Sequence, residues 1–342
     1  MKKNSASDAG GQNQEALEAS INEFNATFSS VEGEVGRVLV GMRDVIRRTL
    51  AAIFAGGHVL LEGSPGLGKT LLVKSISRAL GMTFKRIQFT PDLMPSDVTG
   101  TQVLTEDDTG RRVFTFKPGP IFANIVLADE INRATPKTQS SLLEAMEERQ
   151  VTVLDETYKL PTPFFVLATQ NPIELEGTYP LPEAQLDRFM VKLLVQSPTP
   201  AELKQVLQRT TGNQIPESTP VMAPDEMVQS IGRMRQLVRE VIVPDPLQDV
   251  LVRMFTALTP NSQYATEAVN KYVKFGPGPR GAQSVILCGK VSALLDSRIN
   301  LAFEDIRSVI LPALRHRLIL NFQAEADGIS ADEIIDQIRN AK

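Results

Sequence analysis

Residues 63–70 read Gly-Ser-Pro-Gly-Leu-Gly-Lys-Thr. This stretch fits the pattern G-x-x-x-x-G-K-[ST], in which glycines let backbone N–H groups surround an anion and a following helix points its positive end at the same place. A short apolar run at residues 58–61 precedes the stretch, and apolar residues at helical spacing follow it over residues 70–80. The sequence therefore predicts a phosphate-binding loop between a strand and a helix.

The predicted loop carries the side chains that a nucleoside triphosphate requires. Lys69 can reach the β- and γ-phosphates and the Thr70 hydroxyl can ligate Mg²⁺, so ATP and Mg²⁺ are the expected cofactors. The alternative is a glycine-rich turn with a solvated lysine, but the flanking strand and helix favour the phosphate loop. The residues assigned to nucleotide binding here are Gly63, Ser64, Pro65, Gly66, Leu67, Gly68, Lys69, Thr70 and Leu71.

A second apolar run, residues 125–130, reads Ile-Val-Leu-Ala-Asp-Glu and ends in two acids. Buried strands often end in exposed carboxylates, so this pattern alone is weak evidence for a functional site. Beside a phosphate loop, however, one acid is needed to hold the Mg²⁺ shell and another to position or deprotonate water. We therefore assign Asp129 with Thr70 to the metal and Glu130 to the attacking water.

Composition and charge exclude several classes of protein. Of 342 residues 42% are apolar and 22% charged, which excludes a disordered chain, a collagen-like repeat and a coiled coil. The net charge of −4 argues against a protein that coats nucleic acid. The single cysteine, Cys288, cannot form an intramolecular disulfide, residues 1–14 are unlike a signal peptide, and the longest apolar stretch is too short for a bilayer. We expect a cytoplasmic protein without a membrane span.

The order of patterns along the chain predicts an α/β domain followed by a helical one. Helical spacing marks residues 15–29 and 43–55, and four apolar runs, at residues 58–61, 85–89, 125–127 and 164–168, alternate with helices, as in a mostly parallel sheet. Polar turns at residues 105–110 and 155–156 predict two hairpins. Beyond residue 197 helix-start signals dominate, at Thr199, Asp245 and Ser330. The expected segments are a tail and helix (1–30), the α/β domain (31–197) and a helical lid (198–342).

Further motifs, taken in order, resemble those of AAA+ ATPases and, within them, the MoxR family of the helix-2-insert clade. The resemblance covers residues 40–280 and implies a phosphate-loop AAA+ domain with a parallel sheet and an all-helical lid. The first hairpin matches the family's insert in the second helix, and the second matches its hairpin before sensor 1. The matching segments are residues 40–42, 89–100, 129–134, 168–172, 182–189 and 278–281.

The resemblance also implies roles for single residues. Val40 and Gly41 would lie near the adenine, Asn171 would be sensor 1, Arg188 the arginine finger and Arg280 the sensor 2 arginine. Each has a simpler alternative: Asn171 could cap a turn, Arg188 could pair with its neighbour Asp187, and Arg280 could be an arginine at a helix start, although that is a poor place for a cation. Arg133 could be a second interface arginine or a surface charge. Gly281 stands where the family commonly has alanine.

The resemblance implies ATP hydrolysis between the subunits of a homo-oligomeric ring, expected to be a hexamer. It also implies a chaperone-like role in remodelling a protein client or inserting a metal or cofactor, often with a partner that carries a von Willebrand factor A domain. One rival function is a DNA motor, but acidic residues at both hairpin turns disfavour contacts with phosphates, so we do not expect a nucleic-acid partner. The other rival is a nucleotide-bound scaffold that does not hydrolyse ATP.

Overall fold

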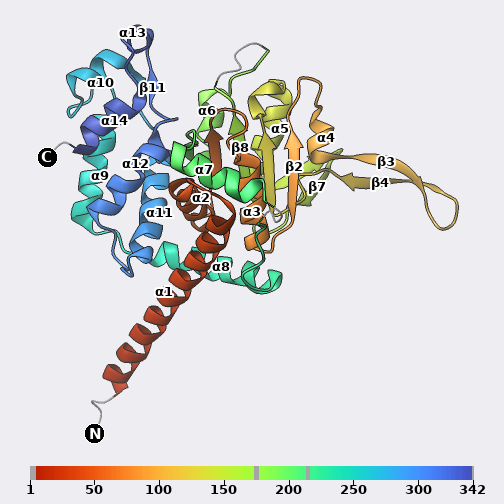
Figure 1. Cartoon of the computed structure of the whole chain (residues 1–342), viewed down its shortest axis with the longest axis horizontal. Helices are drawn as coiled ribbons and strands as arrows, with labels where there is room; N and C mark the ends of the chain where they lie inside the picture. Colours follow the sequence, from red (N-terminus) through yellow and green to blue (C-terminus); the bar gives the residue numbers. More distant parts are fainter. Residues whose placement is uncertain (1–4, 173–176, 213–215, 341–342) are drawn as a thin grey trace.

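The computed structural model describes the backbone of residues 5–172, 177–212 and 216–340, and the side chains from residue 14 onward within these ranges. Its centre is a five-stranded parallel sheet with the strand order β2-β5-β8-β1-β9 (Figure 1). The strands are β1 (His58–Glu62), β2 (Phe84–Gln88), β5 (Ile125–Asp129), β8 (Phe165–Gln170) and β9 (Phe189–Leu194). Sequence patterns predicted the first four. They missed β9, which pairs with β1 along its length.

Helices cover both faces of the sheet because successive side chains of a strand point to opposite faces. Val59 and Leu61 of β1 pack into one buried cluster with the first three helices, whereas Leu60 packs into a second cluster with Leu142. The helices of the first layer are α1 (Ser5–Val38), α2 (Arg43–Ala55) and α3 (Lys69–Ala79). The second layer contains α4 (Pro95–Thr99), the short 3₁₀ helix η1 (Ile131–Arg133), α5 (Pro136–Glu148) and α6 (Glu183–Leu186).

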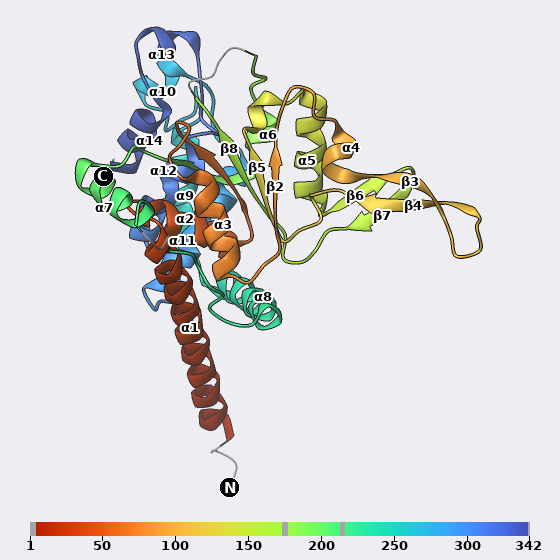
Figure 2. The same ribbon diagram turned by 45° about the vertical axis from the view of Figure 1, so that its right-hand side comes forward.

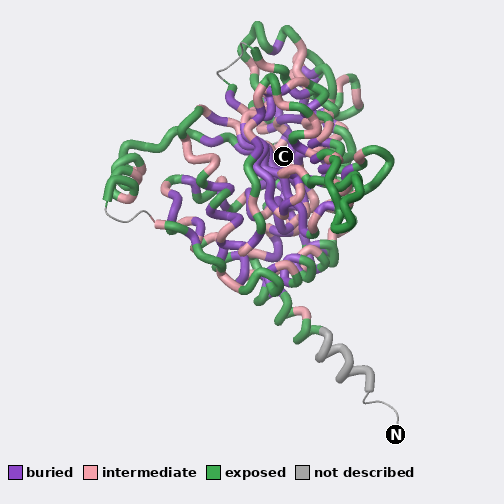
Figure 3. Tube along the Cα trace, turned by 90° about the vertical axis from the view of Figure 1, so that its right-hand side faces the viewer, coloured by how far each residue is buried: buried purple, intermediate pink, exposed green. Residues whose placement is uncertain are grey.

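The first helix differs most from its prediction. Helical spacing marked only residues 15–29, which left residues 1–14 as the expected tail of the 1–30 segment. α1 begins at Ser5, so that expectation is wrong for residues 5–14, and residues 1–4 lie outside the described part. Extending an existing helix costs little per residue, so a packed segment around Phe24 and Phe28 can carry a polar extension. The polar end of α1 projects from the body (Figure 2), while buried residues concentrate in the centre of the molecule (Figure 3).

Both predicted hairpins are present. The first consists of β3 (Gly100–Glu106) and β4 (Arg112–Pro118), and the second of β6 (Gln150–Val153) and β7 (Glu156–Lys159). Phe116 of the first hairpin stacks on Tyr158 of the second with ring centroids 3.9 Å apart. The first hairpin extends well beyond the body on the side away from the helical region (Figure 1).

The last third of the chain is helical, as expected, with one short antiparallel sheet added between β10 (Val273–Phe275) and β11 (Ile319–Leu320). Ser330 forms the predicted capping box with Glu333. Thr199 is the predicted N-cap and also forms a capping box with Glu202, whereas Asp245 is the first helical residue rather than the cap. Among the described residues, no helix has the length and apolar character needed to cross a bilayer. The helices are α7 (Pro200–Thr210), α8 (Pro224–Glu240), α9 (Asp245–Ala257), α10 (Glu267–Tyr272), α11 (Pro279–Leu295), α12 (Phe303–Leu314), α13 (Phe322–Ala326) and α14 (Ala331–Asn340).

Candidate functional site

The predicted phosphate loop connects the carboxyl end of β1 to α3. Gly66 and Gly68 have φ angles of +79° and +83°, in the left-handed region that glycine adopts without strain. A Cβ on Gly63 would lie 2.6 Å from the carbonyl oxygen of Val195. Three of the glycines are therefore required by the backbone itself, which explains why the pattern marks this turn.

The side chain of Lys69 contacts the backbone of the phosphate loop. Its ammonium Nζ donates to the carbonyl oxygens of Gly63 and Ser64, at 2.5 and 2.8 Å. Desolvation lowers the pKa of Lys69, and the nearby carboxylates of Asp129 and Glu130 act in the opposite direction. A phosphate in the loop would supply the anionic partner that the loop carbonyls only approximate.

Asp129 ends β5 as a nearly buried carboxylate beside the loop. Its Oδ1 accepts a hydrogen bond of 2.5 Å from Thr169 Oγ1, and its Oδ2 lies 3.4 Å from Thr70 Oγ1. Hydroxyl and carboxylate oxygens suit Mg²⁺, which keeps several waters and binds mainly through phosphates and one or two protein ligands. Within the described ranges no group of three or more histidine, cysteine or acidic side chains could hold a metal.

Glu130 follows Asp129 in a strained backbone conformation. Its φ of +55° lies in the left-handed region, and its backbone N–H donates to Thr169 Oγ1 at 2.8 Å. Its Oε2 accepts hydrogen bonds from Gln88 Nε2 at 2.8 Å and from Arg133 Nη1 at 3.0 Å. Arg133 therefore contacts Glu130, the candidate base, within its own subunit. Neither sequence-based alternative, a second interface arginine or a surface charge, described this contact.

A cavity of about 1030 Å³, here the loop cavity, adjoins the phosphate loop. Val40 and Gly41, expected near an adenine, line it together with Gly66, Leu67, Gly68 and Leu71, and the helical region contributes α7, α12 and α14 to the opposite wall. Gly63, Ser64, Pro65, Lys69 and Thr70 continue the loop on either side of these lining residues.

Asn171 lies at the same edge of the sheet. It directly follows β8, whose last residue, Gln170, accepts a hydrogen bond of 3.3 Å from the N–H of Gly63. The side chain is buried, at 6% exposure. Asn171 therefore follows the strand next to β1, the strand that precedes the phosphate loop. The family resemblance implies sensor 1 at this position.

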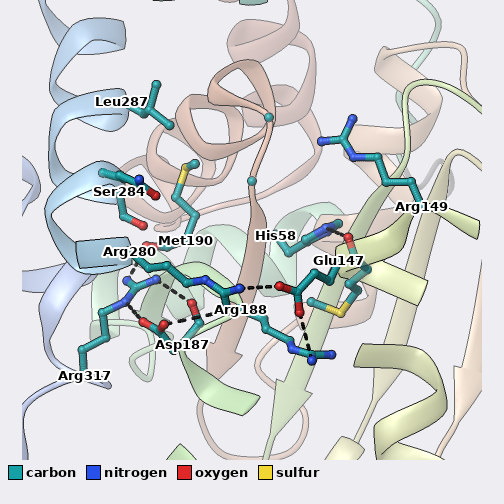
Figure 4. Close-up of a pocket in the computed structure, with 14 residues that line it drawn as sticks. His58, Glu147, Arg149, Asp187, Arg188, Met190, Arg280, Ser284, Leu287 and Arg317 are labelled. Atoms are coloured by element: carbon teal, nitrogen blue, oxygen red, sulfur yellow. Dashed lines mark hydrogen bonds and ion pairs between the residues drawn. The ribbon is translucent and has the colours of Figure 1, made fainter. Parts of the chain in front are cut away.

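The two other predicted arginines lie in a different cavity, of about 410 Å³, here the arginine cavity (Figure 4). Arg188 Nη2 pairs with Glu147 Oε2 at 2.9 Å, and Arg280 pairs with the other oxygen of the same carboxylate. Asp187, the partner of Arg188 in the alternative interpretation, pairs with Arg317 at 2.7 Å and lies 3.9 Å from Arg280. The local ion pair predicted as an alternative for Arg188 is therefore not formed with Asp187.

The two cavities lie at opposite edges of the sheet. Gly56, Gly57 and His58, at the amino end of β1, line the arginine cavity, and the phosphate loop follows the carboxyl end of the same strand. A strand of five residues rises roughly 13 Å over its length. Arg188 and Arg280 are thus separated from the phosphate loop of their own chain by the full height of the sheet.

Two family models match the chain. The model of the ATPase family associated with various cellular activities (AAA) matches residues 58–191, and that of the AAA lid domain matches residues 265–338. Chaperone MoxR1 from Mycobacterium tuberculosis is 41% identical over 305 residues, which are 89% of this chain and 79% of that protein. This chain belongs to the MoxR family of AAA ATPases.

Two further comparisons agree with this result, one with a curated relative and one with a solved structure. Protein MoxR from Methylorubrum extorquens is 30% identical over 317 residues, which are 89% of this chain and 90% of that protein. A solved structure from Cytophaga hutchinsonii is 39% identical and has a TM-score of 0.87, covering 96% of this chain and 98% of that one. The resemblance stated from the motifs and the predicted fold class are therefore confirmed.

Sequence reasoning missed three side chains that the structure brings to these sites. Glu147 joins the two arginines, Gln88 contacts Glu130, and Arg86 pairs with Asp129. For Gln88 and Arg86 a signal existed: they are two residues apart on β2 and therefore share a face, and parallel pairing places Gln88 opposite Asp129. For Glu147 no local signal existed, since its partners lie far away in sequence.

Proposed function

We propose that this chain hydrolyses ATP at the interfaces between subunits of a homo-oligomeric ring, as a hexamer. The main support for this proposal is that the nucleotide-binding residues and the arginine finger of one chain are far apart. The phosphate loop, Asp129 and Glu130 lie at one edge of the sheet, and Arg188 lies at the other. A complete site then requires two copies of the chain, each supplying one half.

In this proposal each residue has a chemical task. Lys69 binds the β- and γ-phosphates, and Thr70 with Asp129 holds Mg²⁺, which supplies charge neutralisation at the phosphates. Asn171 holds the attacking water or the γ-phosphate, and Glu130 takes the proton of that water. Gln88 and Arg133 orient the carboxylate of Glu130 through the hydrogen bonds described above.

The arginines act on the nucleotide of the neighbouring subunit. Arg188 donates to the γ-phosphate as charge develops during transfer, and its planar fork can keep one N–H on Glu147 while others face the phosphate. Arg280 shares that carboxylate, so both arginines belong to one group of charges. We therefore propose that Arg280, as sensor 2, acts on the same neighbouring nucleotide rather than on that of its own chain.

Phosphate release per subunit should rise with protein concentration, because an isolated subunit receives no arginine from a neighbour. Sedimentation velocity at each concentration would report the assembly state alongside the rate. A rate per subunit that stays constant down to monomer concentrations would contradict the interface model. In the same assay, stimulation by duplex or single-stranded DNA would favour a DNA motor, and no phosphate release at all would favour a nucleotide-bound scaffold.

We further propose a chaperone-like role on a protein client, in remodelling or in metal or cofactor insertion, together with a partner that carries a von Willebrand factor A domain. The relative named as a chaperone supports the role. So do the hairpins, because Leu104 and Phe114, a cross-strand pair, are 52% and 71% exposed, and Leu154 at the second turn is 73% exposed. Exposed apolar side chains of this size suit protein contacts.

The proposal also includes a cytoplasmic location and three segments, with the boundaries 1–30, 31–197 and 198–342.

The acidic turn of the second hairpin should contact basic segments of a client. Asp155→Asn combined with Glu156→Gln removes both charges, and asparagine tolerates the φ of +68° at residue 155. We expect weaker binding of a fluorescent lysine-rich peptide, measured by anisotropy, with basal phosphate release close to that of the parent chain. The control variant, Glu106→Gln combined with Asp108→Asn, removes two negative charges from the first hairpin instead. Unchanged peptide binding would contradict the contact, and a large loss of basal rate would show that the turn belongs to the hydrolytic site.

A further inference from the structure

Arg86 pairs with the carboxylate that is expected to hold Mg²⁺. Its Nε and Nη2 both donate to Oδ2 of Asp129, at 2.9 and 2.7 Å. Oδ2 is also the oxygen that lies 3.4 Å from Thr70 Oγ1, and Oδ1 is occupied by Thr169. The guanidinium therefore donates to Oδ2 of Asp129, which is the oxygen nearer to Thr70, the other expected metal ligand.

The fold brings Arg86 to this position through the sheet register. β2 is an edge strand parallel to β5, Gln88 lies opposite Asp129, and Arg86 precedes Gln88 by two residues on the same face. The side chain of Arg86 is 48% exposed, whereas that of Asp129 is 10% exposed. A nearly buried carboxylate needs a counter-charge, and a half-exposed arginine can supply one and still move.

The guanidinium also has a second acceptor. Its Nη2 donates to Oε1 of Gln88 at 2.5 Å while it contacts Asp129. If Arg86 left Asp129, Gln88 and solvent could keep its N–H groups hydrogen-bonded, so displacement would leave no buried donor without a partner. A divalent ion at Thr70 and Asp129, in contrast, would face the positive charge of Arg86 at short range.

We propose that Arg86 is the counter-ion of Asp129 in the empty subunit and that binding of Mg²⁺ with a nucleotide displaces it. Arg86 thereby sets the Mg²⁺ concentration at which nucleotide binding becomes tight. The inference rests on the proposed nucleotide and metal site and names a residue that tunes it. Arg86 is therefore not a catalytic residue, because it acts through Asp129 and not on the reacting atoms.

The test is a Mg²⁺ titration of the binding of a fluorescent ADP analogue, which involves no hydrolysis. In Arg86→Gln the Mg²⁺ concentration at half-maximal binding should fall by about tenfold, since a competing cation is removed from a partly exposed site. Arg86→Lys keeps the charge, and its midpoint should lie closer to that of the parent chain. Lys85→Gln, an exposed lysine on the other face of β2, is the matched control and should leave the midpoint unchanged.

The outcomes separate this inference from the function on which it rests. Binding of the analogue by the parent chain at saturating Mg²⁺ tests the nucleotide site itself. If that binding is present, an unchanged midpoint in Arg86→Gln would overturn the counter-ion role. A raised midpoint would also overturn it and would mean that Arg86 holds Asp129 in place for the metal. Loss of binding at saturating Mg²⁺ in Arg86→Gln alone would mean that the arginine contacts the nucleotide and is not displaced.

Discussion

Arg188→Ala should bind ATP like the parent chain and hydrolyse it about 10³-fold more slowly, the scale of arginine fingers in other nucleotide hydrolases. Binding is retained because Lys69, Thr70 and Asp129 lie at the opposite edge of the sheet and keep their contacts. The rate falls because the charge that develops on the γ-phosphate of the neighbouring subunit loses its partner.

The measurements are phosphate release at saturating ATP and the affinity for a fluorescent nucleotide. Arg188→Lys is a second variant: it keeps the charge and loses the planar fork, so its rate should stay well below that of the parent. Arg253→Ala, at an exposed arginine on α9, controls for loss of a surface charge. A rate for Arg188→Ala within a few-fold of the parent would assign Arg188 a structural role beside Glu147.

Glu130→Gln should retain ATP and release almost no phosphate. The amide can still accept a hydrogen bond from Gln88 or Arg133, but it cannot take a proton from water. We expect a loss of at least about 10²-fold, within the range that general bases contribute. Bound nucleotide recovered from the variant after incubation with ATP should be ATP rather than ADP.

Glu144→Gln, at an exposed acid on α5, is the control for removal of a carboxylate. Turnover by Glu130→Gln at the parent rate would show that another group is the base. Loss of ATP binding would show instead that Glu130 supports the nucleotide site.

Local patterns predicted the parts of the site that depend on local structure. The phosphate loop was identifiable because Gly66 and Gly68 adopt positive φ and Gly63 lies against Val195, requirements that fix residue types at fixed spacing. α2 (Arg43–Ala55) was predicted to its exact residues because its apolar spacing is regular. Asp129 ends a wholly buried strand, which an apolar run of this length indicates.

Features that depend on tertiary contacts were not predicted. β9 alternates buried and less buried residues over a short span, and its place beside β1 follows only from the parallel pairing of distant segments. The pairing of Arg188 with Glu147 joins residues 41 positions apart, since 188 − 147 = 41, although the residue adjacent to Arg188 is itself an acid. Asp187 is paired instead with Arg317, which is also distant in sequence.

If each ATP site is completed by a second subunit, mixing two inactive variants should restore hydrolysis. Arg188→Ala lacks the arginine but keeps its base, whereas Glu130→Gln lacks the base but keeps its arginine. In a mixed ring, an intact Arg188 can meet an intact Glu130 at some interfaces. Mixtures of Arg280→Ala with Glu130→Gln test in the same way whether Arg280 acts across the interface.

Co-assembly would be verified by affinity capture of one tagged variant together with the other, and phosphate release would be measured on the captured rings. Mixed rings of Arg188→Ala and Glu130→Gln should regain a measurable part of the parent rate, while each variant alone stays inactive. Mixed rings that remain as inactive as their components, despite verified co-assembly, would contradict the completion of each ATP site by a second subunit.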